Sequence, residues 1–108
     1  MNDAQKAKQK ANLVKMNLMA EGDELVDCLQ AARYEKLFGF LGSWSQGWIY
    51  FTDKAIVYPL LLGKSIVIPY KNITGVAPCT QSFLPMGIAV TYTNADGQTV
   101  EQKFSMMM

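Results

Sequence analysis

Few side chains in this sequence are suited to catalysis. The chain contains no histidine, the residue that most often transfers protons at neutral pH and activates serine or cysteine nucleophiles. Asp23, Glu24 and Asp27 form an acidic cluster, but paired carboxylates do acid–base chemistry only where a dry cleft separates their pKa values. We interpret the cluster as a solvated cap ahead of a strand, and we expect no enzymatic activity.

The sequence also has no pattern typical of a metal or cofactor site. Cys28 and Cys79 are too few and too far apart for a disulfide framework, and they lack the paired spacing that holds zinc. The segment "GFLGSWSQG", residues 39–47, has the wrong glycine spacing for a phosphate loop and lacks the lysine that would follow. We expect two reduced thiols, no metal and no cofactor.

Composition narrows the class of protein further. The 108 residues are 50% hydrophobic and 18% charged, which is typical of one globular domain with a sizeable core. The formal net charge of +1 and the absence of a dense Lys/Arg stripe argue against nucleic-acid binding. Residues 1–12 are too polar for the centre of a signal peptide, so we expect a cytoplasmic protein.

The elements that position these residues are clearest in "GWIYFTDKAIVYPLLLGKSIVIPY", residues 47–70. Asp53, Lys54 and Lys64 interrupt the hydrophobic runs, so none reaches the about 20 residues of a membrane span. A buried helix is disfavoured because aromatic and β-branched residues dominate and Pro59 would break it. The pattern predicts three strands joined by tight turns, at about 47–52, 55–61 and 64–69.

Downstream segments predict more strands. Residues 72–79 are interpreted as a short strand that is broken by Gly75 and ended by Pro78. In residues 87–93 large hydrophobic side chains alternate with small or polar ones, as in a β-strand. After a turn at 94–97, residues 98–105 are predicted to form the second strand of a hairpin that has one face exposed to water. The segment 23–36 fits neither the helical nor the strand period well.

Residues 2–19 have the pattern of an amphipathic helix. Small and hydrophobic residues recur there at spacings of three and four and share one face: Ala4, Ala7, Ala11, Val14 and Leu18. Four lysines lie largely off that face: Lys6, Lys8, Lys10 and Lys15. We therefore divide the chain into an N-terminal helix, residues 1–19, and a β domain, residues 20–108.

Four segments together resemble the GRAM and bacterial pleckstrin-homology-like (PH-like) family: "AEGDELVDCLQAARYEK", "GWIYFTDKAIVYP", "GKSIVIPYKNITGV" and "GIAVTYTNADGQTVEQKF". The most specific parts are Gly47, Thr52-Asp53-Lys54 and residues 68–73. The resemblance covers about residues 20–105, and it implies a first strand at 24–34. Thr52, Asp53 and Asn72 have a structural explanation as turn residues, because their side chains can bond to nearby backbone amides.

The resemblance implies a mainly β fold, in which about seven strands form a strongly bent antiparallel sheet or partial barrel. In the family, a C-terminal amphipathic helix covers one open end. This sequence ends four residues after Phe104, so we expect that helix to be missing or rudimentary. Three covers for the open end remain as alternatives: the N-terminal helix, a second subunit, or further chain of which this is a piece.

The first two strands hold the lipid site in phosphoinositide-binding relatives of the wider group, which use clustered Lys and Arg there. This sequence offers only Arg33 and Lys36, so we do not expect that site. The loop that follows is hydrophobic, and it contains the candidate contact residues Leu37, Phe38, Phe40, Leu41 and Trp44.

Two functions follow as hypotheses. The first is a non-catalytic PH-like interaction module that self-associates or docks a protein partner through the open end and exposed strand edges. The alternative is peripheral binding to anionic lipid at the inner face of the membrane, through the lysines of residues 1–19 and the 37–44 loop. The expected partners are therefore a second copy or another protein, with an anionic membrane as the alternative.

Overall fold

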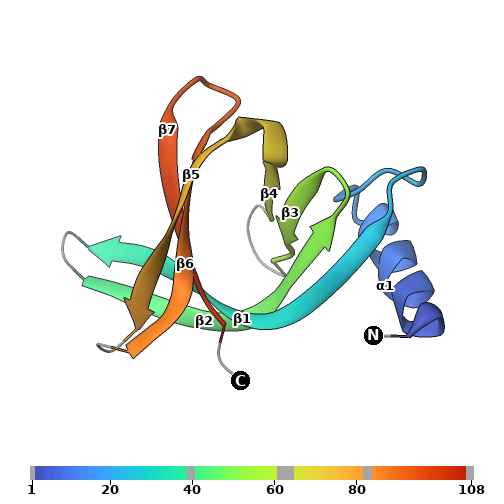
Figure 1. Cartoon of the computed structure of the whole chain (residues 1–108), viewed down its shortest axis with the longest axis horizontal. Helices are drawn as coiled ribbons and strands as arrows, with labels where there is room; N and C mark the ends of the chain where they lie inside the picture. The colour runs from blue at the N-terminus through green and yellow to red at the C-terminus, as the bar shows by residue number, and fades with distance from the viewer. Residues whose placement is uncertain (1, 39–40, 61–64, 82–83, 107–108) are drawn as a thin grey trace.

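The structure is a computed structural model that describes residues 2–38, 41–60, 65–81 and 84–106 (Figure 1). One α-helix precedes seven strands, and a short 3-10 helix links the fourth strand to the fifth. The elements are α1 (Asp3–Lys15), β1 (Leu25–Phe38), β2 (Leu41–Thr52), β3 (Ala55–Tyr58), β4 (Ile66–Pro69), η1 (Tyr70–Asn72), β5 (Ile73–Gln81), β6 (Leu84–Thr93) and β7 (Thr99–Ser105).

All seven strands belong to one antiparallel sheet with the order β4-β3-β2-β1-β7-β6-β5. β1 joins the two halves, because it pairs with β2 along its length and with β7 only through Ala32 and Arg33. The sheet is strongly bent, so that β5, β6 and β7 stand across from β3 and β4 while β1 and β2 run beneath both (Figure 1). The predicted mainly β fold with an N-terminal helix is confirmed.

The inner face of this bent sheet holds the main hydrophobic core. Its buried residues come from both halves of the sheet, and they are Ala31, Ile49, Ile56, Tyr58, Ile68, Val90 and Phe104. The Tyr58 hydroxyl lies 2.9 Å from the carbonyl oxygen of Ala31 and 3.1 Å from that of Ser45, which fixes the ring across β2. Gly47 leaves room for that ring, because a Cβ atom there would clash with the Tyr58 hydroxyl.

The outer face of β1, β2 and β3 packs against α1. A second buried cluster forms there from Leu13, Met19, Leu25, Tyr50, Ala55 and Val57. The Tyr50 hydroxyl also donates to Gln9 Oε1 at 3.0 Å. Asn2 caps the start of α1, since its side chain accepts from Gln5 N while Gln5 Oε1 accepts from Asn2 N.

The helical face predicted for residues 2–19 is wrong where it is formed by alanines, because these side chains do not pack against the sheet. Ala4, Ala7 and Ala11 are exposed, and the buried helix residue is Leu13 at 2% exposure. Burying a leucine removes far more hydrophobic surface from water than burying an alanine, so the helix turns its larger side chain to the sheet. Only Val14 and Leu18 of the predicted face pack against this cluster.

The β1–β2 hairpin is longer than expected. The register runs from Leu25 opposite Thr52 to Phe38 opposite Leu41, so most of the expected 37–44 loop is strand. Aromatic packing supports this extension: Tyr34 lies over Gly42, and its ring meets the Trp44 ring edge-on with centroids 5.2 Å apart. The remaining loop residues 39–40 lie outside the described part of the chain.

β5 also continues past its predicted end, because Pro78 lies within the strand rather than after it. Proline removes a backbone N–H, which an edge strand tolerates since only one of its sides must pair. β5 is such an edge strand, and it pairs only with β6 in the sheet order. The prediction failed because the sequence does not show whether a strand lies at the edge of a sheet.

Candidate interaction surface

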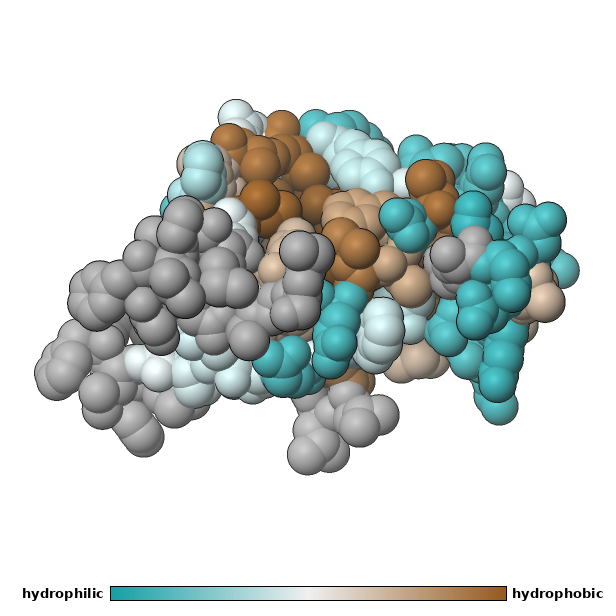
Figure 2. Space-filling view, turned by 60° about the horizontal axis from the view of Figure 1, so that its bottom comes forward, coloured by the Kyte–Doolittle hydropathy of each residue, from teal (hydrophilic) through white to brown (hydrophobic). Residues whose placement is uncertain are grey.

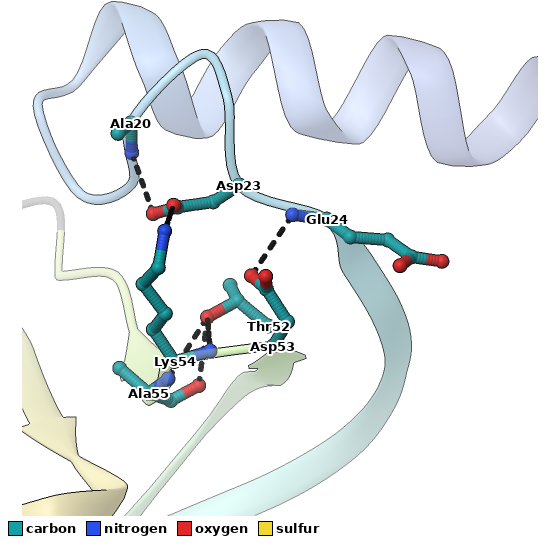
Figure 3. Close-up of polar contacts among 7 residues, drawn as sticks. All are labelled: Ala20, Asp23, Glu24, Thr52, Asp53, Lys54 and Ala55. Carbon is teal, nitrogen blue, oxygen red and sulfur yellow. Dashed lines mark hydrogen bonds and ion pairs between the residues drawn. The ribbon is translucent and has the colours of Figure 1, made fainter.

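The Asp23 carboxylate forms a polar link between the segment after α1 and the β2–β3 turn. The Asp23 carboxylate accepts from Ala20 N at 3.1 Å and from the Lys54 ammonium group (Figure 3). Both donors stabilise the ionised carboxylate, with Lys54 the larger cause, and they hold the pKa of Asp23 below its ordinary value. The same ion pair raises the pKa of Lys54.

Neighbouring bonds complete this link between the segment after α1 and the β2–β3 turn. Asp53 Oδ1 accepts from Glu24 N at 2.9 Å (Figure 3). Thr52 Oγ1 accepts from Lys54 N at 3.1 Å, which confirms its predicted turn role. The Tyr70 hydroxyl donates to the Thr52 carbonyl at 2.7 Å, so two motifs of the sequence resemblance meet in space.

Within the described ranges, no group of three or more His, Cys, Asp or Glu side chains converges as metal ligands would. Cys28 and Cys79 are each half-buried, on β1 and β5. Burial is the main cause that raises the pKa of both thiols, which favours the protonated and less reactive form. No helix of the described part is long and hydrophobic enough to cross a membrane.

The two predicted membrane-contact regions do not meet. The far end of the β1–β2 hairpin and α1 lie at opposite ends of the longest axis of a molecule measuring 40 × 33 × 26 Å (Figure 1). Leu37 and Phe38 end β1, Leu41 begins β2, and Phe40 lies outside the described residues. Trp44 packs on Tyr34 and is only partly exposed.

Two lysines of α1, Lys10 and Lys15, lie near acidic residues. Residues 1–27 contain four lysines but five acidic side chains, and they carry no net positive charge. Lys10 and Lys15 line one shallow hollow together with Glu21, and Lys10 also helps to lower the pKa of Asp23. Arg33 is committed to Glu35 at 3.2 Å, and its side chain is only 15% exposed. At these described residues the cations are therefore shared with neighbouring carboxylates.

The inner core, by contrast, is incompletely covered. Seven hydrophobic residues that pack against it are only partly buried: Phe51, Leu60, Ile66, Ile73, Ile88, Tyr92 and Met106. We call this set the open rim. The N-terminal helix was one of the three covers considered for an open end. α1 itself packs on the outer face of the sheet, and the residues of 2–19 that line the hollow beside β4 are Met16, Asn17 and Leu18, which follow α1.

The opening follows from the sheet order. β4 and β5 end the two sides of the sheet, and no ladder joins them among the described residues, so the sheet does not close. A hollow of about 710 Å³ opens beside β4, with Ile66, Val67 and Tyr92 in its lining. Figure 2 shows hydrophobic residues gathered over the middle of one face, while hydrophilic residues dominate the end that carries α1.

The free edge of β5 borders this uncovered core. Val76 pairs with Val90 of β6, and directly paired residues of antiparallel strands point to the same face. Val90 is fully buried, whereas Val76 is 60% exposed. Val76 was not among the candidate contact residues that the sequence predicted. A signal was present, because residues 72–95 contain no charged side chain.

Comparisons with known proteins bear on the fold alone. No family model matches this chain, and no curated protein matches it in sequence. The structure is similar to the crystal structure of the C-terminal domain of an unknown protein from Leishmania infantum, with a TM-score of 0.59 and 14% sequence identity. The similarity covers 94% of this chain and 83% of that chain.

Proposed function

We propose that this chain is a non-catalytic, PH-like interaction module that self-associates through the open side of its bent sheet. The observation that carries the proposal is Val76, a residue on the core face of β5 that is 60% exposed. The open rim supports it, because exposed hydrophobic surface is typical of protein contact sites.

Two further features support the PH-like and non-catalytic parts of the proposal. One bent antiparallel sheet, with β1 shared between its halves, agrees with the architecture that the sequence resemblance implies. The chain has no histidine, and the carboxylate of Asp23 is used in the ion pair with Lys54. A protein partner also needs no clustered lysines, unlike an anionic membrane.

Size-exclusion chromatography with light scattering, from micromolar to near-millimolar protein, tests the proposal. We expect a mass that rises with concentration from the 12.0 kDa of one chain to that of a dimer or larger closed assembly. A constant mass of one chain over the whole range would rule out self-association. The open rim would then be left as a surface for a different protein.

A further inference from the structure

We infer that two copies of this chain associate by pairing β5 of one copy with β5 of the other, in antiparallel direction. The inference rests on the proposed self-association and names the surface that would carry it. The paired strands would extend each seven-stranded sheet into the sheet of its partner. The same surface serves both copies in such a two-fold contact, so the contact closes with two chains.

The two edge strands of the sheet differ in length. β4 has four residues and ends at Pro69, so it offers little backbone for pairing. β5 has nine residues, Ile73–Gln81, and in the described part of the chain no strand lies along its far side. The obstacles to pairing are Pro78, the sixth of the nine residues, and the register shifts between Ile73 and Gly75 and between Cys79 and Gln81. The backbone N–H groups before Pro78 are the ones that a second strand could pair with.

β5 also lacks the charges that usually prevent edge pairing. Natural edge strands commonly carry lysine or another charge, because an unpaired row of N–H and C=O groups is a template for a second strand. No residue from 72 to 95 is charged, and Lys71 is the nearest charged residue before β5. In an antiparallel pair the two Lys71 side chains lie at opposite ends, whereas a parallel pair would bring them together.

The exposed side chains of β5 fit such a partner. Thr74, Val76, Ala77 and Pro78 are uncharged and exposed, so a second β5 would meet no unpaired charge. Val76 would be covered on the core face, where the open rim lies, by residues of the second copy. Backbone hydrogen bonds would hold the strands together while contacts beside Val76 remove hydrophobic surface from water.

The test compares two valine-to-lysine variants by light scattering over the same concentration range. Val76→Lys places a charge on β5, and Val26→Lys, the matched control, places one on β1, an inner strand of the sheet, at a valine that is 49% exposed. We expect Val76→Lys to raise the dimer dissociation constant about tenfold or more and Val26→Lys to leave it unchanged. Circular dichroism of each variant checks that the fold is kept.

Hydrogen exchange of the wild-type chain provides an independent measurement. The amides of β5 should exchange more slowly at high protein concentration than at low concentration, and the amides of β4 should not change. Suppose that the wild type is a dimer, that Val76→Lys dimerises equally well, and that the wild-type β5 amides gain no protection at high concentration. Pairing through β5 is then wrong, whereas the proposed self-association stands. If the wild type is a monomer throughout, the proposed self-association fails as well.

Discussion

Val76 and Val90 lie directly opposite each other on β5 and β6, yet Val90 is fully buried and Val76 is 60% exposed. The bent sheet thus covers its core as far as β6 and leaves it open at β5. A pair of valines on one face of a sheet normally shares one environment. Their difference marks the edge at which we place the contact with a second copy.

Gly47→Ala should destabilise the fold. A Cβ atom at this position would clash with the Tyr58 hydroxyl, which is held between the carbonyls of Ala31 and Ser45. Overpacking of this kind costs about 1–3 kcal/mol of unfolding free energy. Urea unfolding measures the loss. Gly22→Ala is the control, because nothing lies within 4 Å of a Cβ atom there, and an equal loss in both variants would contradict the explanation.

Leu13→Ala should detach α1 from the outer face of the sheet. Leu13 is 2% exposed and is the buried residue of the helix. Removing a buried leucine side chain costs about 2 kcal/mol or more in unfolding free energy. In the variant, the amides of α1 should exchange faster than they do in the wild type, and this increase should be larger than in the β strands. Met16→Ala, at a residue 45% exposed, should have little effect, and similar losses for both variants would refute this packing face.

Asp23→Asn should lower the melting temperature at neutral pH, because it removes the charge that pairs with Lys54. The folded-state pKa of Asp23 lies below its ordinary value of 3.8. Its contribution to stability is therefore present above 3.8 and is lost as the pH falls through the folded-state pKa. Thermal melts of wild type and variant should converge in acid. Asp96→Asn, at an exposed turn residue, is the control and should leave the melting temperature at neutral pH unchanged.

Anionic vesicles containing phosphatidylserine should not co-sediment this chain in a salt-sensitive way. The four lysines of α1 are offset by five acidic residues within residues 1–27, and α1 lies far from the end of the β1–β2 hairpin. Sedimentation at low and high salt measures the effect. Binding that disappears in high salt and in a Lys8→Glu, Lys15→Glu double variant would favour the membrane alternative over a protein partner.

The sequence alone determined the N-terminal helix and most of the strands, but not the extension of β1 and β2 into the expected 37–44 loop. The alternation at 87–93, the turn at 94–97 and the hydrophobic runs of 47–70 all predicted elements that the structure contains. These signals are local, since side-chain alternation and turn chemistry depend on residues a few positions apart. The ambiguous segment 23–36 needed the family resemblance, because its pattern fits no single period.

Only the tertiary structure decided what each element packs against. The alanines of α1 match a helical face as well as any pattern, but Leu13 is buried because Tyr50 and Val57 present a surface for it. Pro78 was taken to end a strand, yet it lies inside β5 because no strand pairs on the far side in the described part of the sheet. Burial and edge position depend on residues far apart in the sequence, so no local pattern could report that Val76 stays exposed beside a buried Val90.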